Sequence, residues 1–329
     1  NQDFCSTFVI VQANQGQCGD PNDDPLVAGN IATENNNDVK DVEVSINGGD
    51  MSVMVMTDID GNYSIDVPTG GDYTIVPHKD TNPLNGVTTF DMVKIKRHIL
   101  QTELLDSPYK IIAADANHSE HITTLDLVHI QKLILFNVPT FTNNTSWRFV
   151  DADHVFDNPL DPWEGNGFPE IVNINNLAAD ALSEDFIAVK IGDVNQNASG
   201  NNLLGADDRG LDGALTFAVE DKAFYAGEVV EVSFEATEFA HTGYQFTLQF
   251  EADMIELRDI ESTVATEDNF GLTMTSEGII TTSWSAANAV TLEKGEAVFT
   301  LAFTAKSNGR LSDVISLTNR YTQAEAYRA

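Results

Sequence analysis

Two stretches of the chain carry oxygen-bearing side chains at the spacing of a metal-binding loop. They are residues 80–91 ("DTNPLNGVTTFD") and 115–126 ("DANHSEHITTLD"), which align at an offset of 35 residues. Loop positions 1, 3, 9 and 12 are held by Asp80, Asn82, Thr88 and Asp91, and again by Asp115, Asn117, Thr123 and Asp126. Ca²⁺ takes six to eight oxygen ligands, and a twelve-residue loop supplies them from alternating positions. A helix cap needs only one Asp or Ser, so the repeat favours calcium loops over plain capping turns.

The segments that close these loops have the periodicity of helices, which would hold the last ligand of each loop in place. Helices are predicted in 88–101 and 123–135 because apolar residues recur on one face. These residues are Met92, Ile95 and Ile99 in the first segment and Leu127, Ile130 and Ile134 in the second. An apolar residue at loop position 8, Val87 or Ile122, would anchor each loop to its helix.

Two loop–helix units with Asp at positions 1 and 12 resemble the duplicated calcium motif of dockerins. The resemblance implies Ca²⁺ as the cofactor. It assigns as ligands Asp80, Asn82, Thr88 and Asp91, and then Asp115, Asn117, Ser119, Thr123 and Asp126. The first loop departs at position 5, where Leu84 offers only its backbone carbonyl. Asn85 and Glu120 stand at position 6, where Gly is usual, so the second loop is expected to be distorted.

A third stretch, "GDVNQNAS" at 192–199, resembles the start of another such loop. No acidic residue follows at its position 12. Asp193 and Asn195 are therefore expected to complete a site whose other ligands lie elsewhere. In total, we expect two or three Ca²⁺ ions within residues 80–200.

The rest of the chain predicts a mainly β protein with a small α part. Short alternating strands fill residues 26–78, and from 214 onward six segments alternate, including "EVVEVSFEA", "YQFTLQF", "GLTMTS" and "AVFTLAFTA". Residues 137–180 are rich in Asn, Asp and Pro and predict a long ordered loop, followed by a third short helix in 183–200. We divide the chain into an N-terminal strand segment (1–20), a sandwich (21–78), the dockerin-like unit with its loop (79–200), a linker (201–213) and a second sandwich (214–329).

The two sandwiches carry resemblances of their own. Residues 26–78 resemble a carboxypeptidase-regulatory, transthyretin-like sandwich, through "VAGNIAT", "DVEVSI" and "TDIDGNYSIDVPTGGDYTI". Residues 214–329 resemble a cohesin-type sandwich, through "AGEVVEVSFEA", "GYQFTLQFEADMIEL" and "EAVFTLAFTA". This order of parts is similar to the C-terminal region of surface proteins exported by the bacterial type IX route. The resemblance implies an extracellular, cell-surface location and a processed product or fragment.

Charge and hydropathy exclude several classes of partner. Lys and Arg total 17 against 51 Asp and Glu, which gives a formal net charge of −34. Such a chain repels phosphate backbones and anionic membranes, so nucleic acid is not an expected partner. No apolar run reaches about 18 residues, so no membrane insertion is expected. The hydrophobic content of 42% is sufficient for real cores.

No motif of an enzyme stands out in the sequence. The chain contains no GxSxG, no HExxH and no phosphate-binding glycine loop. His118 and His121 could form a zinc pair, but no third ligand has suitable spacing, which favours a solvated loop. Trp147, Trp163 and Trp284 could form a sugar platform, although tryptophans more often anchor cores or loops. We therefore expect no catalytic activity and keep carbohydrate binding as a minor alternative.

The N-terminal residues suggest a role in assembly. Cys5 and Cys18 predict a disulfide around "TFVIVQA" (7–13), with two free thiols as the alternative. Phe8 and Ile10 alternate with Val9 and Val11, so both faces of this strand require burial. The cohesin-like domain looks one strand short after "DVISLTNRYTQAEAY". Phe8–Val11 could fill that gap in the next subunit and form a head-to-tail fibre, or could pair within their own chain.

Three classes of function remain. The chain could be a calcium-rigidified structural or adhesive protein, a module that docks a partner, or the non-catalytic tail of a larger secreted enzyme. The dockerin-like unit is wedged between two sandwiches and is extended by a long loop. This embedding favours a fixed, intramolecular role, so we adopt the structural interpretation.

Overall fold

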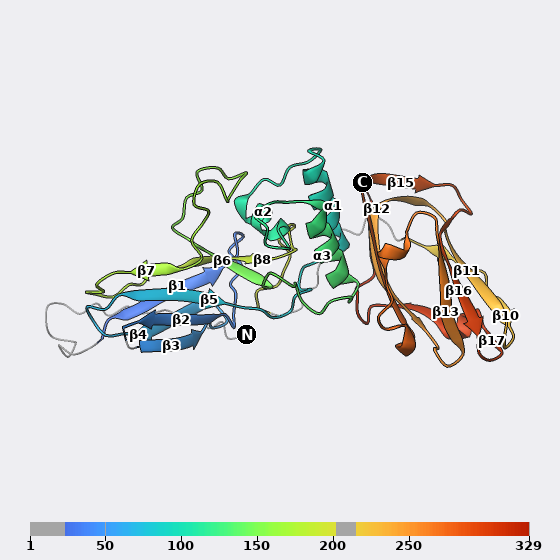
Figure 1. Cartoon of the computed structure of the whole chain (residues 1–329), viewed down its shortest axis with the longest axis horizontal. Helices are drawn as coiled ribbons and strands as arrows, with labels where there is room; N and C mark the ends of the chain where they lie inside the picture. Colours follow the sequence, from blue (N-terminus) through green and yellow to red (C-terminus); the bar gives the residue numbers. More distant parts are fainter. Residues whose placement is uncertain (1–23, 50, 202–214, 329) are drawn as a thin grey trace, which may run out of the picture.

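Residues 24–49, 51–201 and 215–328 are described by the structure, which is a computed structural model. A β-sandwich, a helical unit and a second β-sandwich follow one another along the long axis of the molecule (Figure 1). This arrangement confirms the predicted fold class, two sandwiches flanking a loop–helix repeat. The predicted N-terminal segment (1–20) and nearly all of the linker (201–213) lie outside the described residues.

The first sandwich has two four-stranded sheets, in the orders β4-β1-β8-β6 and β3-β2-β5-β7. Its strands are β1 (Leu26–Ala32), β2 (Glu43–Gly48), β3 (Met51–Met56), β4 (Asn62–Asp66), β5 (Tyr73–His78), β6 (Trp147–Asp151), β7 (Val172–Ile174) and β8 (Phe186–Lys190). The boundary predicted at residue 78 is therefore too early. Three of the strands come from 147–190, where the sequence predicts a long loop and a third helix.

The alternation of side chains in β8 explains why the third helix prediction is wrong. Phe186 and Ala188 pack in the core of the first sandwich, whereas Val189 packs in the core of the helical unit. A strand buried on both faces has a short apolar run, which periodicity cannot distinguish from a buried helix. The same strand pairs with β1 in parallel and with β6 antiparallel, so it joins the first two parts of the molecule.

The helical unit contains α1 (Thr89–Ile99), α2 (Pro108–Ala114) and α3 (Thr124–Ile134). The predicted helices in 88–101 and 123–135 are confirmed. Each begins with a capping box, in which Thr88 pairs with Asp91 and Thr123 pairs with Asp126. The short helix α2 was not predicted, although Ser107 as N-cap and Pro108 at the first turn are its usual signals. No helix in the described part is long and apolar enough to cross a membrane.

The second sandwich has sheets in the orders β13-β16-β11-β9 and β14-β15-β12-β18, and β19 also pairs with β12. Its strands are β9 (Phe217–Ala218), β10 (Ala223–Phe224), β11 (Val229–Ala236), β12 (Phe239–Phe250), β13 (Ile255–Ser262), β14 (Phe270–Gly271), β15 (Ile279–Leu292), β16 (Ala297–Ala305), β17 (Gly309–Arg310), β18 (Ile315–Thr318) and β19 (Glu325–Arg328). Short helical turns are η1 (Glu267–Asn269), η2 (Thr275–Glu277) and α4 (Leu311–Val314).

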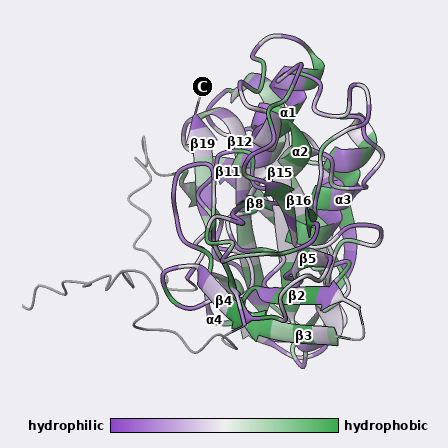
Figure 2. Ribbon diagram, turned by 90° about the vertical axis from the view of Figure 1, so that its left-hand side faces the viewer, coloured by the Kyte–Doolittle hydropathy of each residue, from purple (hydrophilic) through white to green (hydrophobic). Residues whose placement is uncertain are grey.

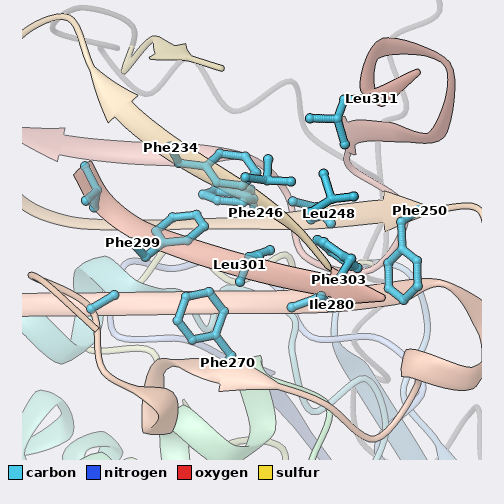
Figure 3. Close-up of a cluster of buried hydrophobic side chains, with 14 of the residues drawn as sticks. Phe234, Phe246, Leu248, Phe250, Phe270, Ile280, Phe299, Leu301, Phe303 and Leu311 are labelled. Atoms are coloured by element: carbon cyan, nitrogen blue, oxygen red, sulfur yellow. The ribbon is translucent and has the colours of Figure 1, made fainter. Parts of the chain in front are cut away.

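Aromatic side chains fill the core between these two sheets (Figure 3). The rings of Phe234 on β11 and Phe299 on β16 stack with their centroids 4.5 Å apart, and Phe246 from β12 lies across from them. The predicted strand in 271–276 is wrong, because β14 ends at Gly271 and a turn follows, and the strands β13 and β18 were not predicted. Because this core is densely packed, the second sandwich presents a rigid outer face to the helical unit.

Candidate calcium sites

The loop 115–126 holds its two aspartates in a network of backbone hydrogen bonds. The carboxylate of Asp115 accepts hydrogen bonds from the backbone N–H groups of Ser119 and Glu120, both at 2.8 Å. Asp126 accepts from the N–H of Asn117 at 3.1 Å and from the N–H of Thr123 at 2.8 Å. Glu120 adopts a left-handed φ of 63°, as its place at loop position 6 predicts. Both carboxylates are fully buried, at loop positions 1 and 12.

A second network of the same form is split between two distant parts of the chain. Asp193 accepts hydrogen bonds from the N–H groups of Asn197 at 3.2 Å and Ala198 at 2.7 Å. Asp91, on the first turn of α1, accepts from the N–H of Asn195 at 3.0 Å and from the N–H of Thr88 at 2.9 Å. Residues 193–198 thus correspond to the first half of the loop 115–126, and Thr88 and Asp91 correspond to its last residues.

The correspondence between the two networks holds position by position. Asp193, Asn195 and Asn197 match Asp115, Asn117 and Ser119, each at an offset of 78 residues, whereas Thr88 and Asp91 match Thr123 and Asp126 at an offset of 35 residues. Asn85 bridges the break in the chain, since its side chain bonds both the N–H and the carbonyl of Ser199. Gly86 lies directly against Ala198, where a Cβ atom would be only 2.7 Å from the backbone of Ala198.

The placement of Asp91 differs from the predicted continuous loop 80–91. Asp80 accepts hydrogen bonds from the backbone and hydroxyl of Ser146, at 2.8 and 2.9 Å. Asn82 adopts a left-handed φ of 50°, and Leu84 packs against the apolar core of the helical unit. The first loop therefore contributes its closing residues, Thr88 and Asp91, to the site that the 193–199 segment begins.

The buried ammonium of Lys190 lies close to the split network. Its Nζ donates to the carbonyl of Pro83 at 2.7 Å. Burial lowers the pKa of Lys190, while the carboxylates of Asp193, Asp91 and Asp80 act in the opposite direction. This cation compensates part of the negative charge that the three aspartates concentrate here.

Both networks have features that a bound cation would explain. The Oδ1 atoms of Asn117 and Asn197 are buried and accept no hydrogen bond from the described residues. Burial and the charge of Asp193 raise the pKa of Asp91, and burial raises the pKa of Asp193 and of Asp126. A divalent cation would satisfy the amide oxygens and offset the repulsion between the paired carboxylates.

The donor set at each site is mixed. No cluster of three or more His, Cys, Asp or Glu side chains is placed to hold a metal ion in the described part of the chain. Each site instead offers two carboxylates, and the further oxygens come from amides, hydroxyls and backbone carbonyls, which are the ligands that Ca²⁺ accepts. Asn197 was missed by the sequence prediction. The alternation of Asp193, Asn195 and Asn197 at positions 1, 3 and 5 is the signal that could have revealed it.

Beside the split site, α1 packs on the outer face of the sheet formed by β12 and β15 (Figure 1). The N–H of Thr89 donates to Gln245 Oε1 at 2.7 Å, and the hydroxyl of Thr89 lies 2.7 Å from that of Ser283. Lys96 Nζ donates to the carbonyl of Ser285 at 2.6 Å. The ring of Phe90 stacks on Tyr327 of β19 at 5.1 Å. The polar outer face of this sheet is thus buried, although such a face normally meets water.

The C-terminal end of α3 contacts the second sandwich through its last carbonyl groups. The hydroxyl of Thr322 donates to the carbonyl of Ile134 at 3.1 Å, and that of Thr281 donates to the carbonyl of Leu135 at 2.8 Å. The last carbonyls of a helix have no partner within the helix, so these hydroxyls complete its end. Gly271 is required at this contact, since a Cβ atom there would lie 2.1 Å from the Leu135 carbonyl oxygen.

The remaining predicted residues divide into two groups. Trp147 and Trp284 are 2% and 6% exposed, so neither ring is available as a sugar platform, and Trp163 is partly buried against the helical core. Cys5, Cys18 and the assembly strand Phe8–Val11 lie outside the described residues.

Comparisons with known proteins identify no family. No family model matches the chain, and no curated protein matches it. Among solved structures, a chain of a type I cohesin–dockerin complex from Clostridium thermocellum aligns with 35% of this chain and 94% of its own length, at 8% identity and a TM-score of 0.25. A type I cohesin from Pseudobacteroides cellulosolvens aligns with 34% of this chain and 84% of its own length, at 18% identity and a TM-score of 0.24.

A further solved structure aligns with most of the chain. The full-length major pilin of Corynebacterium diphtheriae covers 88% of this chain and 58% of its own length, at 8% identity and a TM-score of 0.26. At these identities and TM-scores, the likenesses carry no conclusion about function.

Proposed function

We propose that the chain is a non-enzymatic, extracellular structural protein. In this proposal Ca²⁺ rigidifies the helical unit, and the unit is docked on the second sandwich of its own chain. The interface of α1 with β12 and β15 carries the proposal. Thr89 and Ser283 are completely buried there and bonded to each other. A dockerin-like unit that recruits a separate partner through this face would need the face to be free.

The two candidate calcium sites support the proposal that Ca²⁺ rigidifies the helical unit. Each combines a pair of buried carboxylates with an amide oxygen that lacks a hydrogen bond. Sites of extracellular modules bind Ca²⁺ at roughly 10⁻⁴ to 10⁻³ M, which suits calcium levels outside a cell. The split site would join residues 88–91 to 193–197 and so hold β8 against α1. The continuous site would order the turn that begins α3.

A calcium titration tests this role. We expect about two Ca²⁺ per chain by elemental analysis after equilibration at about 10 mM Ca²⁺, one for each site, because this concentration exceeds the expected dissociation constants at least tenfold. Since a ligand that binds only the folded state stabilises it, calcium at 100 times its dissociation constant should add about 2.7 kcal/mol per site. Chelation should therefore lower the melting temperature of the helical unit, as followed by calorimetry.

A matched control separates these sites from general charge effects. Asp106 is an exposed acid of the same unit that pairs with Lys110, and Asp106→Asn should leave both the calcium content and the effect of chelation unchanged. A chain that contains no calcium after equilibration, and melts at the same temperature with and without EDTA, would contradict the proposal. Replacement of Ca²⁺ by Mg²⁺ should restore little stability, because Mg²⁺ demands a tighter octahedral geometry.

A second candidate function, a head-to-tail filament subunit, is favoured by the free edge of β11. Among the described residues its partner on that side is β9, which pairs with Glu235 and Ala236. On the side of β16, the carbonyl of Glu228 accepts from the N–H of Ala305. Because the backbone groups of successive strand residues point in opposite directions, those of Val229, Glu231 and Ser233 point toward the free edge. An open edge of this kind accepts an added strand, and Phe8–Val11 of another copy is the proposed donor.

Proline substitution at this edge tests the filament. Glu231→Pro removes one outward N–H, while the pairing of β11 with β16 uses its neighbours, so the sandwich should remain folded. We expect both Glu231→Pro and deletion of residues 1–13 to abolish filaments seen by electron microscopy. Filaments with an unchanged subunit repeat in either variant would rule out this mechanism. Glu261→Ala, a change of an exposed acid on the opposite edge strand β13, is the control.

A further inference from the structure

The strand β3 is an exposed edge strand with an unusual composition for such a position. Its sequence, "MSVMVM", contains no charge, no proline and no glycine. Met54 and Met56 are 58% and 49% exposed, whereas Val55 packs toward the core of the first sandwich. Figure 2 shows β3 as a largely hydrophobic strand at the rim of the molecule. Both faces of this strand are therefore apolar, in a chain whose net charge is −34.

One edge of β3 has free backbone groups. Within the described residues β3 pairs only with β2, and it is the first strand of its sheet. The N–H of Thr57 donates to the carbonyl of Val42 at 2.9 Å, on the β2 side. Because successive residues alternate, the N–H and carbonyl groups of Ser52, Met54 and Met56 point away from β2. These three residues present a regular row of donors and acceptors without a bulge.

Soluble proteins usually protect such an edge with lysine, proline, a bulge or a covering segment, because it pairs readily with other strands. The edge of β3 has none of the first three. We propose that residues 7–13, "TFVIVQA", of the same chain cover it by pairing as an additional edge strand. The sequence of this segment is complementary in character, since it is uncharged, rich in β-branched residues and apolar on both faces.

The connection between the two segments favours the same chain over a second copy. Residues 14–25 link the strand to β1, and twelve residues span up to about 40 Å when extended. β1 pairs with β4, and β4 lies next to β3. A link of this length gives an effective concentration in the millimolar range, which a second copy with a like charge of −34 does not reach in dilute solution.

The proposal has a consequence for assembly. If the chain polymerises through the β11 edge, residues 7–13 must first leave β3, so the two edges compete for one strand. Cover of β3 would then hold the dilute chain as a monomer. The proposal does not depend on calcium or on the docking of α1, and it stands or falls separately from them.

Amide hydrogen exchange tests the pairing directly. The full chain at low concentration should show slow exchange at Met54 and Met56, and deletion of residues 1–13 should increase their exchange at least tenfold. The amides of Val53 and Val55, which face β2, are internal controls and should change little. In a second variant, Met54→Pro blocks the edge without removing a bond to β2, and should increase exchange within residues 7–13.

Each alternative occupant gives a different result. Equal exchange at Met54 and Met56 with and without residues 1–13 would overturn the proposal. Protection that rises with protein concentration would assign the edge to a second copy, and would also overturn it. Protection that the deletion removes at Val229 and Glu231 in place of Met54 and Met56 would assign the strand to β11.

Discussion

The helices α1 and α3 share one sequence pattern but have different surroundings. At an offset of 35 residues, Thr89 matches Thr124 and Val93 matches Val128. Thr89 and Val93 are completely buried, and Thr89 is bonded to the second sandwich, whereas Val128 is 42% exposed and Thr124 is also exposed. The repeat therefore specifies the local turn and helix, and the second sandwich decides which part of each copy is buried: the N-terminal turns of α1, but only the C-terminal end of α3 among the described contacts.

Three contacts that only α1 makes account for the difference. Gln245 accepts from the N–H at the first residue of α1, Ser283 bonds the hydroxyl of Thr89, and Tyr327 covers Phe90. The equivalent of Phe90 on α3 is Leu125, which is 53% exposed. These contacts lie beside Asp91, so the helix docked through its N-terminal turns is also the one whose proposed calcium loop is split. The helix α3, which meets the sheet at its C-terminal end, carries the continuous loop.

The largest expected effect comes from placing a charge in the docked face. Thr89→Lys would bury an ammonium between α1 and the sheet. The two surfaces pack closely there, since a Cβ atom added at Gly243 of β12 would lie only 3.1 Å from Thr89 Cγ2. An uncompensated buried charge costs about 3 to 5 kcal/mol, so we expect α1 to detach from the sheet. Hydrogen exchange across β15 and small-angle scattering would report the loss of docking.

Thr124→Lys is the matched control, since it makes the same change at the equivalent position of α3. This side chain is exposed, so the free energy of unfolding should change by less than about 0.5 kcal/mol. Similar effects of the two substitutions would show that the α1 face is not the docked one. The comparison between the helices would then lose its basis.

A smaller effect is expected when the split and continuous calcium loops are compared. In the calcium-loaded chain, Asp91→Asn replaces a buried carboxylate that accepts hydrogen bonds from Thr88, Val194 and Asn195. Hydrogen bonds to a charged group contribute about 1.5 to 3 kcal/mol, so we expect a destabilisation of about 2 kcal/mol with loss of one calcium ion. Because Asp91 joins distant segments, exchange should also increase in β8 and at the α1 interface.

Asp126→Asn makes the same change in the continuous loop. It should remove one calcium ion and increase exchange in residues 115–126, with the α1 interface unchanged. Calorimetry, calcium analysis and hydrogen exchange on both variants measure the difference. An α1 interface that loosens equally in both variants would show that the split loop has no special connection to docking.

The sequence was sufficient to predict the local parts of this structure. Alternation predicted four of the five long strands of the second sandwich, β11, β12, β15 and β16, and apolar periodicity predicted α1 and α3. The oxygen residues of 115–126 do meet in one loop, as their spacing predicts. These features depend on residues within about twelve positions of one another, and such short-range chemistry is visible in a single sequence.

The features that the sequence did not reveal depend on long-range pairing. Asp91 meets Asn195 from more than one hundred positions away, so α1 supplies the acid that the 192–199 segment lacks at its position 12. In the same way, the sequence of β8 predicts a helix, because its apolar residues pack in two different cores and therefore do not alternate with polar ones. The docking of α1 depends on Gln245 and Ser283, whose polar side chains resemble those of any solvent-facing strand.

The smallest expected effect concerns Lys96, which α1 has in the place of Gln131 on α3. Burial in the interface lowers the pKa of Lys96 to about 8, from 10.5 in the unfolded chain. Between these pH values the unfolded chain binds a proton that the folded chain lacks, so this lysine makes stability rise with pH from about 8 toward 10. Lys96→Gln should remove this component, because glutamine does not titrate.

Denaturant unfolding at fixed calcium, from pH 7.5 to 10, measures the difference between the two proteins. Parallel pH profiles would show that Lys96 is not buried in the interface, whereas a wild-type profile that rises relative to the variant would support the docked position of α1.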